Sequence, residues 1–283
     1  MLNNTLDDQL LVMIMQSDYI LPLVEISKLN SPLLEDRLSV AQALDQACKE
    51  VGFLYLKGEQ FQPELFENLC RISTQYFARD EQSKMQQYIG FSENHSGYVP
   101  IGEEQFVKNV YDLKESYDVN YDYLGTEQRR PLVGPTQWPE DAEFKQHVSQ
   151  YYQHLKDIGQ KLFQCFALAL GLKETYFDAH IAHAPSQLRL IHYPFNPQAQ
   201  DQEGMGAHTD YECFTLLLPT APGLQVLNKQ GEWIDIPLIE NTLIMNIGDM
   251  MEILSNGRYL ATKHRVKKVK QQRYSFPLFF SCD

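Results

Sequence analysis

Leu188-Arg-Leu-Ile-His-Tyr193, Phe214-Thr-Leu-Leu-Leu218 and Thr242-Leu-Ile-Met-Asn-Ile247 are three of the short β-rich runs that decide the fold of this chain. Similar runs lie at 224–227, 233–236, 264–266 and 274–280, and turn-forming residues separate them. Short strands at this spacing are typical of an antiparallel sandwich or barrel. The sequence after Pro185 therefore predicts a β core.

The first half of the chain has a different pattern, in which helices outnumber strands. We expect strands at 21–26 and 53–56 and helices at 33–50, 63–78 and 141–170, the last as one long helix or two shorter ones. No repeat or low-complexity segment interrupts the chain. The prediction is a single α+β domain, with residues 1–185 as a helical support region that carries the first strands and residues 186–283 as the core.

Composition and charge limit the classes of function. Lys and Arg number 24 against 37 Asp and Glu, and the formal net charge of −13 repels nucleic acid and anionic membranes. An enzyme that acts on a small molecule fits better.

The apolar run at 10–15 is too short for a signal peptide or a membrane span. The five cysteines are scattered and form no C-x-x-C motif, which predicts reduced thiols and a cytoplasmic protein. The oligomeric state is left open.

A candidate metal site begins at His208-Thr-Asp210. In extended backbone, residues two apart project to the same face, as two ligands of one ion must. His264 is the one later histidine, and two histidines with one carboxylate suit non-haem Fe(II) with positions left open for a co-substrate and O₂. An H-x-D motif alone also occurs in surface turns, so it needs further support.

A candidate carboxylate clamp follows in Arg273-Tyr-Ser275. The two outer residues of this motif also project to one face of a strand. A guanidinium and a hydroxyl in that position can grip a carboxylate through charge-assisted hydrogen bonds. An ion site and a clamp in the same strand-rich half strengthen each other.

These motifs together resemble the isopenicillin N synthase-like family of Fe(II)/2-oxoglutarate-dependent oxygenases. Further motifs support the resemblance over nearly the whole chain: Leu21-Pro-Leu-Val-Glu-Ile, Val51-Gly-Phe-Leu-Tyr, Ser96-Gly-Tyr-Val-Pro, Asp112-Leu-Lys-Glu-Ser-Tyr, Gly223-Leu-Gln-Val, Asn246-Ile-Gly-Asp249 and Asn256-Gly-Arg-Tyr. The resemblance implies a double-stranded β-helix, a jelly-roll, cupin-like core with supporting N-terminal helices.

The resemblance also implies roles for particular residues. His208, Asp210 and His264 would hold Fe(II), and no other catalytic residue is predicted. The distal carboxylate of the co-substrate 2-oxoglutarate would be gripped by Arg273, Ser275 and Tyr193. The chain departs from many plant members at Ile191, where they often have asparagine.

The implied reaction uses 2-oxoglutarate and O₂ to oxidise an unactivated C–H bond of a small molecule, with release of succinate and CO₂. Hydroxylation is the expected outcome, and desaturation or ring closure are variants. Three alternatives stay open: a same-family oxidase that does not use 2-oxoglutarate, an ethylene-forming type of reaction, and a non-catalytic binding module.

Other conspicuous residues have structural interpretations. His180 and His183 form an H-x-x-H pair without suitable partners, so we expect no metal there. The Asn246–Asp249 motif is expected to turn a strand and pack near the site. The basic run 263–273 is interpreted as a hairpin with solvent-facing lysines, while His264 and Arg273 point inward. Five residues are candidates for the substrate pocket: Tyr98, Tyr117, Tyr121, Phe280 and Arg189.

Overall fold

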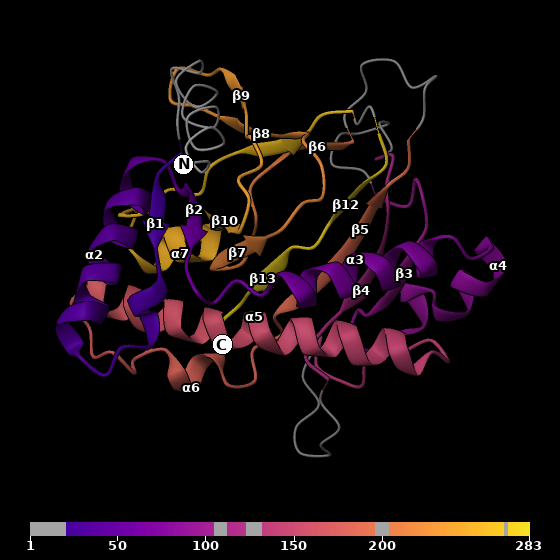
Figure 1. The fold of residues 1–283 in the computed structure, drawn as a ribbon, viewed down its shortest axis with the longest axis horizontal. Coiled ribbons are helices and arrows are strands. Elements are labelled where there is room, and N and C mark those ends of the chain that lie inside the picture. Colours follow the sequence, from indigo (N-terminus) through magenta and orange to yellow (C-terminus); the bar gives the residue numbers. More distant parts are fainter. Residues whose placement is uncertain (1–20, 105–111, 123–131, 196–203, 269–270) are drawn as a thin grey trace, which may run out of the picture.

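The computed structural model describes residues 21–104, 112–122, 132–195, 204–268 and 271–283. These residues form three layers: a group of helices, a large β-sheet and a smaller β-sheet (Figure 1). The helices cover one face of the large sheet, and the small sheet lies over the other face. None of the helices in this part of the chain is both long and apolar enough to cross a membrane.

The large sheet combines strands from both halves of the sequence. In spatial order it contains β1 (Leu23–Glu25), β2 (Phe53–Lys57), β10 (Thr242–Ile247), β7 (Phe214–Leu217), β13 (Leu278–Phe280), β5 (Gln187–Tyr193), β4 (Glu115–Val119) and β3 (Gly97–Val99), and β12 (Arg273–Ser275) also pairs with β5. All the pairs are antiparallel except β1 with β2. The large sheet of the β core therefore also contains four strands from the predicted support region, β1, β2, β3 and β4.

The small sheet contains β6 (Met205–His208), β11 (His264–Val266), β8 (Leu224–Leu227) and β9 (Trp233–Asp235), in that order. Its strands are antiparallel. Two sheets in this arrangement form the jelly-roll core that the resemblance implied. The pocket described below lies between them.

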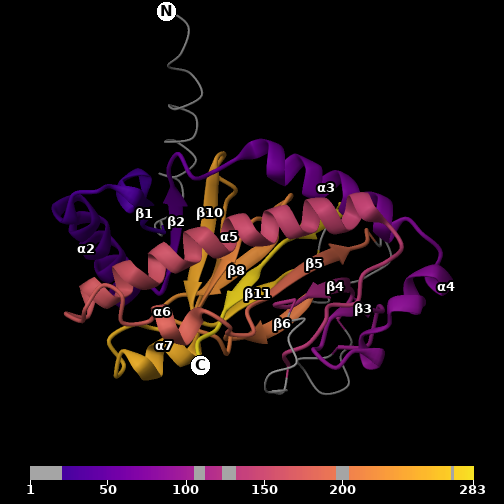
Figure 2. The same cartoon turned by 90° about the horizontal axis from the view of Figure 1, so that it is seen from below.

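The long helix α5 (Ala142–Ala169) runs across the large sheet (Figure 2). Asp141 caps its start by accepting a hydrogen bond from the Phe144 N–H at 2.9 Å. Gly171, at φ +73°, follows its end. Midway along, Gly159 lies so close to the Phe280 ring that an added Cβ would fall 1.9 Å from a ring carbon. The helix thus packs tightly against β13.

Two further helices, α2 (Leu34–Glu50) and α3 (Pro63–Phe77), pack against α5. Proline suits the first position of α3 because that position needs no backbone hydrogen bond. Short helices complete the chain: η1 (Ser27–Asn30), α4 (Glu81–Lys84), η2 (Met85–Gln87), η3 (Ile89–Phe91), α6 (Asp178–Ile181) and α7 (Asp249–Leu254). The helices predicted at 33–50, 63–78 and 141–170 are confirmed within a residue or two at each end.

The strand predictions are less complete. The run predicted at 274–280 is two strands, β12 and β13, which end and begin on either side of Pro277. Proline has no N–H to donate to a ladder, so the pairing with β5 is interrupted there, and β13 resumes it while also pairing with β7. The sequence pattern missed β3, β4 and β6, which are short or contain glycine and polar residues.

Alternation along the strands gives the large sheet two chemically different faces. On β5, Leu188 and Leu190 belong to the large apolar core under the helices, whereas Ile191 and Tyr193 line the pocket. On β12, Arg273 and Ser275 line the pocket, and the residue between them faces the core. The register of the strands therefore decides which side chains reach the site.

Candidate iron and 2-oxoglutarate site

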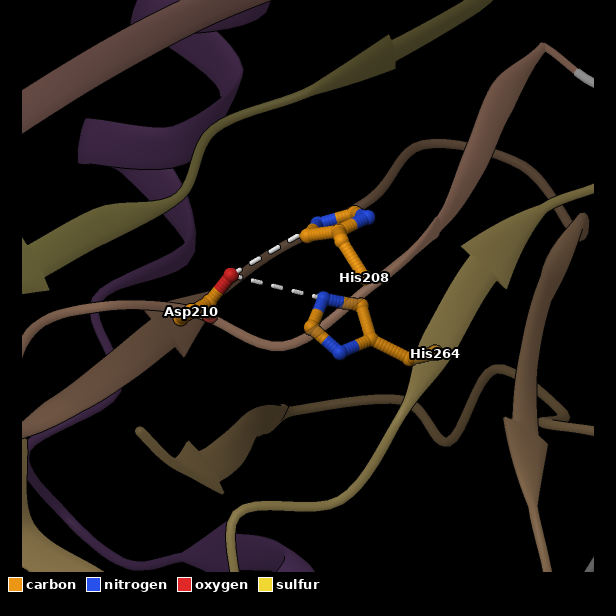
Figure 3. Close-up of side chains that lie close together, drawn as sticks. All are labelled: His208, Asp210 and His264. Carbon is orange, nitrogen blue, oxygen red and sulfur yellow. Dashed lines mark ion pairs between the residues drawn. The ribbon is translucent and has the colours of Figure 1, made fainter. Parts of the chain in front are cut away.

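Three potential metal ligands from two strands and a loop meet at one point. His208 ends β6, His264 begins β11, and the two residues are opposite each other in the register. Asp210 follows β6 directly and turns its carboxylate toward both rings (Figure 3). Its Oδ1 lies 3.6 Å from His208 Nε2 and 3.5 Å from His264 Nε2. Within the described ranges, this is the one group of three or more such side chains placed to hold a metal ion.

Hydrogen bonds orient each of the three side chains. His208 Nδ1 lies 2.8 Å from the Gly206 carbonyl oxygen, and His264 Nδ1 lies 3.2 Å from that of Thr262. A ring whose Nδ1–H donates to a carbonyl presents its Nε2 lone pair to the metal. Both imidazoles are thus held in the form that a metal requires.

The carboxylate of Asp210 is held from behind. Its Oδ2 accepts hydrogen bonds from Thr215 Oγ1 at 2.5 Å and from Asn246 Nδ2 at 2.7 Å. These contacts leave Oδ1 directed at the two histidines. Asn246 is the last residue but one of β10, which ends at Ile247, and the chain then enters α7 at Asp249. The expectation that this motif turns a strand and packs near the site is confirmed. A buried amide in an otherwise apolar strand was the signal for this role.

The pKa values of His208 and Asp210 favour the protonation states that bind a cation. Burial, and then the neighbouring His264 imidazole, lowers the pKa of His208 to about 4. Burial alone would raise the pKa of Asp210, but the two imidazoles and the hydrogen bonds from Asn246 and Thr215 outweigh it, so this pKa lies below its usual range. At neutral pH the site therefore offers a neutral imidazole and an ionised carboxylate, which suit a divalent metal ion.

A buried guanidinium lies beside the metal ligands in the same pocket. Arg273 is fully buried, and its Nε donates to the Ala221 carbonyl oxygen at 3.1 Å. Its Nη1 and Nη2 are also buried and make no hydrogen bond in the described structure. A buried cation without an anion is unstable, and burial lowers the pKa of Arg273. The two nitrogens therefore suit the carboxylate of a ligand.

The rest of the predicted clamp lies on the same face. Tyr193 is the register partner of Arg273, and the guanidinium carbon lies 4.8 Å from the centre of its ring. Ser275 is paired with Ile191, and both line the pocket. The pocket joins the metal group to this clamp, and its lining is Ile191, Tyr193, Met205, His208, Asp210, Thr215, Leu217, Leu224, Asn246, His264, Val266, Arg273, Ser275, Pro277 and Phe279.

Farther along the same face of the large sheet lies a charged cluster, which we define as Glu104, Asp112, Lys114, Asp118 and Arg189. Arg189 Nε donates to Asp118 Oδ1 at 2.9 Å, and its Nη2 donates to Glu104 Oε1 at 2.8 Å. Lys114 donates to the other Glu104 oxygen. The cluster adjoins the iron site because Asp112 Oδ1 accepts from the Gly206 N–H, on the strand of His208, at 3.4 Å.

The candidate pocket residues have different outcomes. Tyr98, Tyr117 and Phe280 belong to the core under the helices, so their prediction as pocket residues is wrong. They occupy the opposite positions of the strand alternation. The Tyr121 hydroxyl contacts His183 Nδ1 at 3.0 Å, and it does not line the pocket. Arg189 lies on the pocket face, but carboxylates of the chain already occupy two of its nitrogens.

The residues interpreted as structural have partners of their own. His180 Nδ1 lies 3.0 Å from the Asp283 backbone oxygen, and no metal-ligand group includes His180 or His183 in the described residues. In the basic run, His264 and Arg273 are buried, whereas Lys263 and Lys267 are exposed. The prediction that lysines face solvent while His264 and Arg273 point inward is confirmed for these residues. The predicted hairpin is wrong, because β11 pairs with β6 and β8 in the small sheet whereas β12 pairs with β5 in the large sheet.

A two-histidine-one-carboxylate centre between the sheets of a jelly roll, with a buried arginine beside it, defines the class of non-haem iron oxygenases. Comparison with known proteins agrees. The family model described as "2OG-Fe(II) oxygenase superfamily" matches residues 184–281. The model described as "non-haem dioxygenase in morphine synthesis N-terminal" matches residues 21–141. The chain belongs to the 2OG-Fe(II) oxygenase superfamily, and the resemblance stated from the sequence is confirmed.

Individual relatives cover most of the chain. A rice homoarginine-6-hydroxylase is 33% identical over 292 residues, which are 95% of this chain and 88% of the relative. A 2-oxoglutarate-Fe(II) type oxidoreductase of Emericella nidulans is 30% identical over 87% of this chain and 74% of its own. The crystal structure of a full-length Neurospora crassa protein in complex with alpha-KG and thymine has a TM-score of 0.80 at 28% identity and covers 95% of this chain and 87% of that one.

The protein is a 2-oxoglutarate-dependent non-haem iron oxygenase, with Fe(II), 2-oxoglutarate and O₂ as its requirements. The residues present fit this set, because the donor atoms suit Fe(II) and the unpaired Arg273 nitrogens suit a carboxylate. When bound, the iron supplies the activation of O₂. The surrounding chain orients the three potential ligands through hydrogen bonds, and the pocket that they line lies between the two sheets.

Proposed function

We propose that this oxygenase hydroxylates an unactivated C–H bond of a small polar molecule, with release of succinate and CO₂. In this proposal His208, Asp210 and His264 hold Fe(II), and Arg273, Ser275 and Tyr193 hold the distal carboxylate of 2-oxoglutarate. The observation that carries it is the buried Arg273 guanidinium, whose two terminal nitrogens have no partner in the described chain although the metal group shares its pocket.

The charged cluster supports a polar substrate. Arg189 is two residues from Ile191 on β5, so both project to the pocket face, and Ile191 lines the pocket. A wall that contains buried carboxylates and cations favours a ligand with polar or charged groups over a hydrocarbon. The relatives agree with a small molecule of this kind, since one is named for homoarginine and another was crystallised with thymine.

The first experiment tests the co-substrate site. Under anaerobic conditions, Fe(II) and 2-oxoglutarate added to the purified protein should give a visible metal-to-ligand charge-transfer band. The band should be lost in Asp210→Ala and strongly weakened in Arg273→Met, whereas Arg265→Met, with its guanidinium stacked on Trp233, should keep it. A folded wild-type protein without the band would contradict the proposed ligand set.

The second experiment identifies the substrate class. Homoarginine, arginine, lysine, thymine and uracil would be supplied in turn, with O₂ uptake and succinate release measured together. The expected result is one compound that stimulates O₂ uptake and succinate release in equal molar amounts. The mass spectrum of this compound should show the gain of one oxygen atom. O₂ uptake without succinate would favour an oxidase, ethylene in the headspace would favour an ethylene-forming reaction, and tight 2-oxoglutarate binding with no turnover on a broad panel would favour a binding module.

We also propose that the protein works in the cytoplasm without nucleic-acid or membrane partners. The five free cysteines and the net charge of −13 support this proposal. Fractionation of cells that express the tagged protein tests it. Recovery in a membrane or an exported fraction would overturn it.

A further inference from the structure

Two of the five cysteines meet behind the loop that carries Asp210. Cys213 is fully buried just before β7, and Cys282 is half-buried just after β13. Their sulfur atoms lie 3.5 Å apart, and the Cys213 thiol donates to the Cys282 sulfur. The two segments are joined by the Cys213 N–H, which donates to the Phe280 carbonyl oxygen at 2.8 Å. The thiols are therefore held together by the sheet.

The environment makes these two thiols unequal. The hydrogen bond from Cys213 lowers the pKa of Cys282 and raises that of Cys213. Cys282 is also the more exposed of the two, and it contacts the Met250 thioether at 3.5 Å. An accessible thiol of lowered pKa beside a second thiol is the usual arrangement of an attacking cysteine and a resolving cysteine.

We propose that Cys213 and Cys282 form a reversible disulfide when hydrogen peroxide reaches the protein, and that this bond loosens the iron site. Cys282, as the thiolate, attacks one peroxide oxygen, the O–O bond breaks, and a sulfenic acid and water form. The Cys213 sulfur then attacks the sulfenic sulfur, the S–O bond breaks, and the second water leaves with the remaining protons. Two thiols lose two electrons in total, and one peroxide is reduced to two waters.

The link to the iron site is the backbone of residues 210–213. The Asp210 carbonyl oxygen accepts from the Asp249 N–H at 2.8 Å, and the Cys213 carbonyl oxygen accepts from the Gly248 N–H at 3.0 Å. A disulfide bond is about 2.05 Å long, so the sulfurs must approach each other by about 1.5 Å. Because the loop is pinned at both ends to the start of α7, this movement strains the segment that positions the Asp210 carboxylate.

The other cysteines lack this arrangement. Burial raises the pKa of Cys70 and of Cys165 to about 12, and it raises the pKa of Cys48 further. None of the three contacts another sulfur through a hydrogen bond in the described ranges. Peroxide should therefore act on the Cys213–Cys282 pair first.

The test uses the full-length, metal-free protein, so that peroxide does not oxidise bound iron. After brief treatment with a small excess of hydrogen peroxide and removal of the excess by catalase, alkylation should block three thiols instead of five. Peptide mapping should show a cross-link between Cys213 and Cys282, and dithiothreitol should restore five thiols. Cys282→Ser should abolish the cross-link, whereas the matched variant Cys70→Ser should keep it.

The coupling to iron is measured separately. The oxidised protein, returned to anaerobic buffer, should bind Fe(II) at least about tenfold more weakly than the reduced protein. Changes to the residues that orient a metal ligand typically weaken metal binding by this much. Dithiothreitol should restore the affinity, and Cys282→Ser should be insensitive to the treatment. Five alkylated thiols after peroxide, or a cross-link that involves another cysteine, would overturn the disulfide. Unchanged iron affinity in the cross-linked protein would overturn the coupling.

Discussion

His208 and His264 lie opposite each other on neighbouring strands, with ring centres 4.3 Å apart. The pairing of β6 with β11 brings these residues together from distant parts of the sequence, and Asp210 completes the group from the adjoining loop. Because both rings are mounted on one small sheet, their separation depends on strand register. The supports of the third ligand, the carboxylate, are on the large sheet.

The first prediction concerns those supports. Asn246→Leu keeps most of the side-chain volume but removes the amide that donates to Asp210 Oδ2. The carboxylate then loses one of its two orienting hydrogen bonds, and Fe(II) affinity should fall about 10–100-fold. Anaerobic titration with the charge-transfer band as the signal measures this. Thr242→Val, on the same strand but bonded to the Ile239 carbonyl, is the matched control and should bind iron normally.

The second prediction concerns the buried Arg273. In Arg273→Met an apolar side chain replaces a buried cation without an anion, so the free energy of unfolding without 2-oxoglutarate should stay the same or rise. With 2-oxoglutarate at 100 times its dissociation constant for the wild-type protein, the free energy of unfolding of the wild-type protein should rise by about 2.7 kcal/mol. That of the variant should hardly change at the same concentration. Denaturation of the metal-loaded protein with and without 2-oxoglutarate measures both. Equal stabilisation of the two proteins would contradict the clamp.

The third prediction concerns pH. Burial raises the pKa of Asp112 from an ordinary 3.8 to about 6. Between about pH 4 and 6 the folded state therefore binds more protons than the unfolded state. As the pH rises through this range, Asp112 lowers the free energy of unfolding, by at most about 3 kcal/mol in total. Asp112→Asn does not titrate, and its stability relative to wild type should increase from pH 4 to 6 and then level off.

Urea denaturation at a series of pH values tests this prediction. Thr242→Val, which changes no titratable group, is the control, and its difference from wild type should stay nearly constant over the same range. A constant difference for Asp112→Asn as well would show that the Asp112 carboxyl does not bear this burial penalty.

The fourth prediction concerns the charged cluster. Arg189→Met leaves the buried Asp118 without its cation, and loss of one partner of a buried ion pair should destabilise the protein by about 3–5 kcal/mol. The partly exposed Glu104 keeps its ion pair with Lys114. Lys267→Met removes an exposed ion pair with Asp235 and should cost less than about 1 kcal/mol. Thermal and chemical denaturation of both variants make the comparison. Similar small losses in both would mean that the cluster is well hydrated.

The local elements and the chemistry of the ligands were predictable from the sequence. Periodic apolar residues and terminal glycines predicted α2 and α5, and the H-x-D spacing placed His208 and Asp210 on one side of the chain. The pocket was harder to predict. Tyr98 and Phe280 were predicted to line it because their segments border the iron in the family that the chain resembles, but each side chain lies on the core face of its strand.

The sequence by itself determined the types of metal ligand, the helices and the spacing of the strands in the second half. These features depend on side-chain chemistry and on periodicity within short segments. Only the tertiary structure decided that Asn246 and Thr215 hold Asp210, that Arg273 is buried with two unpaired nitrogens, and that Cys213 meets Cys282. These relationships depend on which strands pair and in which register. A shift of one residue would turn the side chains of Asn246, Thr215 and Arg273 to the other face of their sheet.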